Sequence, residues 1–146
     1  MPQRRLEMGR RDVVRRGGDS SLRQLDEWTV ARREAAQRYR ELGLAEACST
    51  PADEPGHVYH LFVSRSPQSE SIRAALSAAE IGNAQYYLPP LHLQPALRYL
   101  GYSEGDLPET ERAAEDNFSV PLWAGIAPAQ QERVVETVLA AAGVAA

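Results

Sequence analysis

The sequence contains no lysine, because all 16 of its basic residues are arginine. The chain therefore has no side-chain amine with which to form a Schiff base, and no phosphate-binding loop of the lysine-bearing type. Its single cysteine, Cys48, excludes an internal disulfide and a cysteine-rich metal site. We predict that Cys48 is a small apolar residue of the core.

Long apolar runs are also absent. No stretch approaches the roughly 20 apolar residues that a membrane-spanning helix requires, and residues 1–5 lead into no apolar segment of the secretory type. With 146 residues, of which 43% are apolar and 25% are charged, the chain has the size and composition of one globular domain. We expect it to be cytoplasmic and to have no membrane partner.

The net charge of −4 arises from two unlike segments, since residues 1–40 contain 11 arginines and six acids, whereas residues 41–146 contain five arginines and 14 acids. A basic segment can bind nucleic acid. However, residues 4–16 contain no aromatic side chain to stack on bases. We therefore expect no nucleic-acid partner, and interpret residues 1–21 as a disordered basic arm.

Hydrophobic periodicity and turn residues indicate an α/β (α+β) domain over residues 22–142, followed by a frayed tail at 143–146. A helix is expected over residues 22–42, with Leu25, Trp28 and Tyr39 on one buried face. The clearest strand covers residues 57–65. Extended segments are expected at 83–88 and 118–123, which would make a short sheet of about three strands. Pro and Gly residues delimit the further helices, which are expected at 67–82, 95–99, 107–117 and from 128 onwards.

The histidines do not have the spacing of a metal site. His57 and His60 would lie on opposite faces of the predicted strand, and His92 is distant from both in sequence. We therefore predict no metal ligands, and no hydrolase triad.

The most unusual segment is residues 85–95, which contains two tyrosines, three prolines and a histidine. Prolines stiffen such a segment, so that it could present phenol and imidazole groups to a ligand. Alternatively, the segment is a stiff connection whose tyrosines fill the core. The residue pattern alone leaves both interpretations open.

Residues 86–95, Tyr-Tyr-Leu-Pro-Pro-Leu-His-Leu-Gln-Pro, resemble the signature of the DegT/DnrJ/EryC1/StrS aminotransferases, although Leu88 replaces a usual proline. Other motifs of that family have similar counterparts in the same order. These are the "LGY" and "GDLPxxE" motifs at 100–111, the "LSLP" strand at 119–122, the closing helix at 127–138, and the helix linking the two domains at 25–39.

This resemblance implies the small C-terminal domain of a fold-type I enzyme that uses pyridoxal phosphate (PLP) to aminate keto sugars, usually nucleotide-linked ones. The large domain, with its cofactor lysine and phosphate pocket, has no counterpart here. One reading is a fragment of a transaminase, inactive alone and exposing an apolar surface, on the helix 22–42 or the signature segment, where the large domain would dock. The alternative is a non-enzymatic module that docks on a transaminase partner chain.

The resemblance also implies the site. Tyr86, Tyr87 and His92 would face the cofactor–substrate cleft, and Glu111 would give structural support near the signature segment. We predict no catalytic residue in this chain, because the Schiff-base lysine is absent. PLP is expected in the complete enzyme and not in this chain alone. The implied partners are a large domain or partner transaminase chain, a second copy in a homodimer, and a sugar-nucleotide substrate.

Overall fold

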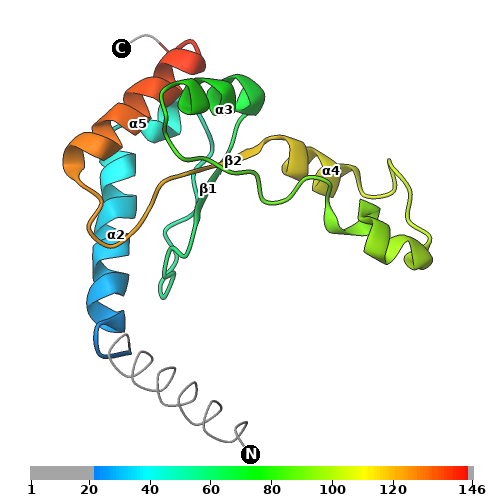
Figure 1. The fold of residues 1–146 in the computed structure, drawn as a ribbon, viewed down its shortest axis with the longest axis horizontal. Helices are drawn as coiled ribbons and strands as arrows, with labels where there is room; N and C mark the ends of the chain where they lie inside the picture. The colour runs from blue at the N-terminus through cyan, green and yellow to red at the C-terminus, as the bar shows by residue number, and fades with distance from the viewer. Residues whose placement is uncertain (1–21, 145–146) are drawn as a thin grey trace, which may run out of the picture.

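The fold is seen in a computed structural model that describes residues 22–144 (Figure 1). The predicted basic arm at 1–21 and the last two residues of the predicted tail lie outside the described residues. No helix within residues 22–144 is long and apolar enough to cross a membrane. The elements in chain order are α2 (Leu25–Glu41), η1 (Leu44–Glu46), β1 (Phe62–Arg65), α3 (Ser69–Ala78), η2 (Leu91–Leu93), η3 (Pro95–Leu100), α4 (Pro108–Glu115), β2 (Asn117–Val120) and α5 (Pro128–Ala141).

The predicted mixture of helices and a small sheet is confirmed, but the expectation of three strands is wrong. The sheet has two antiparallel strands, β1 and β2, in a register that pairs Phe62 with Val120. The expected third strand makes only one isolated bridge, between Ala84 and Ser119. Side chains of β2 replace a backbone ladder here. The amide of Ala84 donates to the hydroxyl of Ser119 at 3.0 Å, and the amide of Tyr86 donates to the side-chain oxygen of Asn117 at 2.7 Å.

The first strand is also shorter than predicted, since β1 begins only at Phe62. Tyr59 has a φ of 47°, in the left-handed region that interrupts an extended backbone. The alternating apolar pattern of residues 57–61 therefore belongs to a segment that precedes the sheet.

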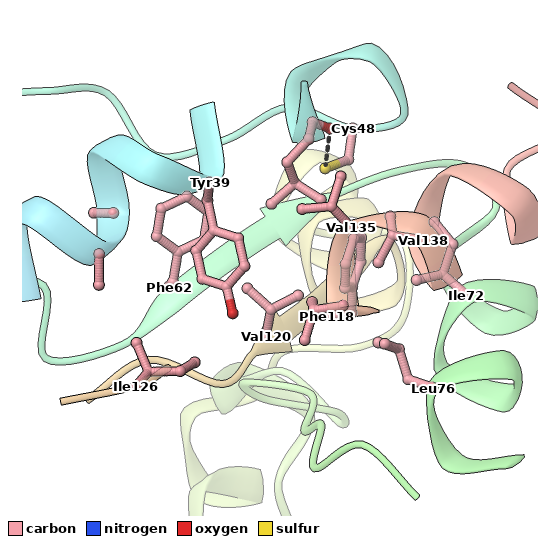
Figure 2. Close-up of a cluster of buried hydrophobic side chains, with 14 of the residues drawn as sticks. Tyr39, Cys48, Phe62, Ile72, Leu76, Phe118, Val120, Ile126, Val135 and Val138 are labelled. Atoms are coloured by element: carbon pink, nitrogen blue, oxygen red, sulfur yellow. Dashed lines mark hydrogen bonds between the residues drawn. The ribbon is translucent and has the colours of Figure 1, made fainter. Parts of the chain in front are cut away.

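The core lies between the sheet and the helices α2, α3 and α5, as Figure 2 shows. Tyr39 of α2 packs against Phe62 of β1, with 5.4 Å between the ring centroids. Cys48 is buried among these apolar side chains, which confirms its predicted place in the core. Burial raises the pKa of its thiol. Other fully or almost fully buried members are Leu44, Ile72, Leu76, Phe118, Val135 and Val138.

Only the C-terminal half of α2 contributes to this core. Ala35, Ala36 and Tyr39 are buried, whereas Leu25 is 45% exposed and Trp28 is 38% exposed. The prediction that Leu25 and Trp28 share the buried face is therefore wrong. The physical reason is that the N-terminal half of α2 runs beyond the body formed by α3 and α5 (Figure 1).

Arginines of α2 hold the segment 50–60 that leads into β1. The Nε atoms of Arg32 and Arg33 donate to the carbonyl oxygens of Val58 and His57, at 2.9 Å and 2.8 Å. Arg40 donates to the carbonyl of Pro51 and to the hydroxyl of Tyr59, both at 2.9 Å. We call these four hydrogen bonds, made by three arginines, the arginine clasp.

Candidate functional site

The signature segment forms most of an arm, residues 86–116, that projects from the body and contains η2, η3 and α4 (Figure 1). Its large apolar side chains are mostly exposed rather than packed into the core. They are Tyr87, Leu88, Leu91, Tyr99, Leu100, Tyr102 and Leu107. An arm of this kind offers a contact surface rather than a second core.

Asn117 joins the two ends of the arm. Its side-chain oxygen accepts a hydrogen bond from the amide of Tyr86 at 2.7 Å, where the arm begins. Its side-chain nitrogen donates to the carbonyls of Ala113 and Ala114, where α4 ends. Gln85 also donates to the carbonyl of Ala114, at 2.8 Å. The sequence analysis did not identify Asn117; the available signal was a polar residue at the start of an apolar strand.

Within the arm, His92 and Glu111 form a partly buried hydrogen bond. His92 is 7% exposed, and its Nε2 lies 3.0 Å from Oε1 of Glu111. Glu111 also accepts hydrogen bonds from the amides of Gly105 and Leu107. The amide of Gly105, and then His92, hold the pKa of Glu111 below its ordinary value. Because this carboxylate is ionised at neutral pH, the Nε2 atom of His92 carries the hydrogen.

The two tyrosines of the signature lie at the start of the arm. Tyr87 is 63% exposed, and its ring meets that of Tyr86 edge-on with 5.1 Å between centroids. The structure therefore brings Tyr86 and Tyr87 together at the surface. His92 points instead towards Glu111 and packs edge-on against Tyr102, at a centroid distance of 6.0 Å.

Two further patterns of reactive residues do not form a functional site in the described residues. Residues 101–105 read Gly-Tyr-Ser-Glu-Gly and match the spacing of a hydrolase nucleophile elbow, which the sequence analysis overlooked. Such an elbow joins a strand to a helix, whereas this segment follows the 3-10 helix η3, and the amide of Ser103 donates to Asp106. Within residues 22–144, no group of three or more His, Cys, Asp or Glu side chains is placed to hold a metal ion.

Comparison with known proteins identifies the family. The sequence matches the model of the DegT/DnrJ/EryC1/StrS aminotransferase family over residues 17–139. The chain belongs to this family. A pleiotropic regulatory protein of Geobacillus stearothermophilus is 39% identical to it, over 78% of this chain and 32% of the relative. A dTDP-3-amino-3,4,6-trideoxy-α-D-glucose transaminase of Micromonospora megalomicea is 32% identical, over 92% of this chain and 37% of the relative.

Solved structures agree with the fold of this DegT/DnrJ/EryC1/StrS chain. DesV of Streptomyces venezuelae is 31% identical, with a TM-score of 0.76 over 83% of this chain and 33% of that one. An aminotransferase of the same family from Brucella abortus gives a TM-score of 0.73 at 28% identity. The chain thus spans about a third of the relatives and structures that it matches.

The residues of this DegT/DnrJ/EryC1/StrS chain do not by themselves fit the PLP that the family implies. A covalent bond to the cofactor aldehyde requires a lysine amine, and no lysine is present in the sequence. This chain therefore offers no amine for that bond.

Proposed function

We propose that this chain supplies the small-domain part of a PLP-dependent aminotransferase that acts on nucleotide-linked keto sugars. The observation that carries the proposal is the match to a relative named as a dTDP-sugar transaminase over 92% of this chain but only 37% of the relative. The chain alone is not catalytically competent, because PLP and its lysine have to come from a large domain or a partner chain. The complete enzyme is a cytoplasmic homodimer.

The arm contributes one wall of the cofactor–substrate cleft. Tyr87 presents its exposed phenol to the substrate, and Tyr86 supports the Tyr87 ring from the side. His92 supports the same wall from inside the arm. Its Nε2–H group donates a hydrogen bond to Glu111. Glu111 in turn fixes the loop before α4 through the amides of Gly105 and Leu107.

A fusion protein tests this function. The parent enzyme is the S. venezuelae dTDP-3-amino-3,4,6-trideoxy-α-D-glucose transaminase, which is 30% identical to this chain over the region where the two match. Its N-terminal two thirds would be joined ahead of residue 17 of this chain. We expect the fusion to show PLP absorbance and to transfer an amino group to the keto-sugar substrate of the parent enzyme. A fusion that holds PLP but transfers no amino group would refute the proposal.

Variants of the same fusion test the site residues. Tyr87→Phe removes one hydrogen-bonding hydroxyl, so we expect kcat/KM to fall about five- to tenfold. Tyr99→Phe, a matched change at an exposed tyrosine on η3, is expected to have no effect. His92→Ala and Glu111→Gln should each lower kcat/KM, and their combined effect should be less than the sum, because both weaken the contact between His92 and Glu111. Unchanged kinetics in His92→Ala would reject its role.

The second candidate is a non-enzymatic module that docks on a transaminase partner. The exposed apolar side chains of the arm and of α2 favour it. It predicts that the unfused 146-residue chain binds a complete transaminase and changes its activity, while the fusion protein fails to transfer an amino group. Size-exclusion chromatography of the mixed chains, followed by the transaminase assay, separates the two candidates.

A further inference from the structure

A hollow of about 240 Å³ lies on the body, where the end of α3 meets the first turns of α5. Figure 1 shows these two helices side by side, apart from the arm. The walls of the hollow come from three parts of the chain, at residues 80–82 after α3, 121–126 after β2 and 130–134 of α5. We call it the α3–α5 pocket. The proposed function gives this pocket no role.

Most of the pocket lining is apolar. Ile126 and Val134 are buried, and Ile81 is half-buried. Trp123 also lines the pocket and is 45% exposed. Drug-sized ligands occupy sites of roughly 300 Å³ or more. This smaller hollow, with its apolar lining and one accessible indole, therefore fits a small molecule that carries a single apolar group.

Two opposite charges line the same pocket without pairing. Glu80 follows α3, and Arg133 lies on α5. Among the ion pairs within residues 22–144, none joins Glu80 to Arg133. The carboxylate of Glu80 also makes no hydrogen bond in that part of the chain. A carboxylate and a guanidinium that are held apart in one hollow match a zwitterion, whose ammonium and carboxylate groups can each meet the opposite charge.

The guanidinium of Arg133 is held in place by the end of α3. Its Nη2 atom donates to the carbonyl oxygen of Ala79 at 2.6 Å, and its other N–H groups make no hydrogen bond within residues 22–144. These groups are therefore available to a carboxylate. The end of α3 carries the negative end of the helix dipole, which favours an ammonium group placed beside it.

Glu80 occupies a backbone position at which glycine is usual. Its φ is 57°, and its amide donates to the carbonyl of Ser77. The amide of Ile81 donates to the carbonyl of Leu76. Together these bonds form the Schellman arrangement that ends a helix, in which the left-handed residue is usually glycine because a side chain is strained there. A strained residue of this kind points to a functional constraint, and here it brings a carboxylate to the pocket.

We infer that the α3–α5 pocket binds a free α-amino acid with an apolar side chain. Glu80 and the end of α3 hold the ammonium group, and Arg133 holds the carboxylate. The apolar side chain of the ligand lies against Trp123 and Ile126. The inference concerns the body of the chain and does not depend on the proposed function.

The two tryptophans of the sequence make this testable, because only Trp123 lines the pocket. The full 146-residue chain would be produced with 5-fluorotryptophan, and its two fluorine NMR signals would be assigned with Trp28→Phe and Trp123→Phe. The probe is L-leucine. We expect it to shift the Trp123 signal saturably, with a dissociation constant of about 1 mM, and to leave the Trp28 signal unchanged.

Analogues of leucine separate the contributions of the two charges. 4-Methylpentanoate keeps the apolar group and the carboxylate but lacks the amine, whereas 3-methylbutylamine keeps the amine but lacks the carboxylate. Each analogue loses one charge-assisted contact, so we expect each to bind at least tenfold more weakly than leucine. L-alanine keeps both charges and should also bind more weakly, because its methyl group covers less of the apolar lining.

Variants of the chain assign each charge to its partner. Glu80→Gln should remove the preference for leucine over 4-methylpentanoate, and Arg133→Gln should remove the preference for leucine over 3-methylbutylamine. Glu136→Gln and Arg98→Gln change exposed residues outside the pocket and should alter neither preference. Circular dichroism verifies that each variant is folded. If Arg133→Gln is not, Glu80→Gln with the two carboxylates decides the result.

Three results would overturn the inference. The first is the absence of a saturable shift of the Trp123 signal at about 50 mM leucine. The second is binding of both analogues as tightly as leucine, which would make the pocket an unselective apolar hollow. The third is an equal shift of both fluorine signals, which would place leucine in the separate hollow that Trp28 and Trp123 line beside α2. Because the chain is tested unfused, none of these results affects the proposed function.

Discussion

Single polar side chains shape the arm by binding its backbone amides. Asn117 accepts a hydrogen bond from the amide of Tyr86, and Glu111 accepts hydrogen bonds from the amides of Gly105 and Leu107. Neither contact follows from hydrophobic periodicity, which reports only which side chains are buried. The signature resemblance did place Glu111 near the segment, but its partners depend on how the loop 101–107 folds back on α4.

Glu111 makes the stability of the arm depend on pH. Its pKa lies below the ordinary 4.5, so the ionised carboxylate favours the folded state. This contribution is complete above that ordinary value and is lost as the pH falls through the lower pKa of the folded state. We expect Glu111→Gln to lower Tm at pH 7, and the difference from the parent to shrink and disappear as the pH falls through the lowered pKa of the folded state.

Circular dichroism melting at pH 7 and at successively lower pH measures this difference. Glu115→Gln changes an exposed acid on the same helix and serves as the control. It should change Tm little at any of these pH values. A Tm difference for Glu111→Gln that grows as the pH falls would contradict the assigned role of the carboxylate.

At the scale of elements, residues that restrict the backbone were the best predictors. Pro128 and Pro108 begin α5 and α4 as expected, and Gly101 ends η3 with a φ of 79°. The predictions were wrong where contacts between distant segments determine the backbone conformation. The alternating pattern of residues 57–61 looked like a strand, yet Tyr59 adopts a left-handed φ and the arginine clasp holds this segment against α2.

The clasp should therefore control the order of residues 51–59. Arg40→Gln removes the donor to Pro51 and leaves the buried Tyr59 hydroxyl with only Asp53 as partner. We expect a loss of about 1–3 kcal/mol in the free energy of unfolding. Amide hydrogen exchange should become faster in residues 51–59 and remain unchanged in α5.

Urea unfolding and exchange mass spectrometry measure the two effects. Arg98→Gln, on the exposed helix η3, is the matched control and should change neither. If exchange in residues 51–59 stayed at the parent rate in Arg40→Gln, the clasp would not be what orders this segment.

The whole molecule divides into a body with an apolar core and an arm without one. The fold class, helices around a small sheet, was correctly predicted, and so was the family. Motifs in several parts of the sequence indicate both. Periodicity alone did not predict the exposed half of α2, since a helical apolar stripe has the same pattern whether it packs on its own domain or on another chain. The family resemblance did name helix 22–42 as one candidate for an exposed apolar surface.

This division predicts unequal effects of apolar truncation. Phe118→Ala in the fully buried core should cost about 3–5 kcal/mol of unfolding free energy. Leu91→Ala on the arm, where Leu91 is 62% exposed, should change it by less than about 0.5 kcal/mol. Urea denaturation of the two variants checks this, and a large loss in Leu91→Ala would mean that the arm shares the core.

Asn117 has a consequence for how such proteins diverge. Its one side chain binds the backbone at both ends of the arm, so the path of the chain through the body is closed without the arm. An insert of different length or shape can be attached at the same two points while β2 keeps its pairing with β1. The arm is therefore an insert whose two ends lie side by side at one strand, so that a change in its length need not disturb the pairing of β1 with β2.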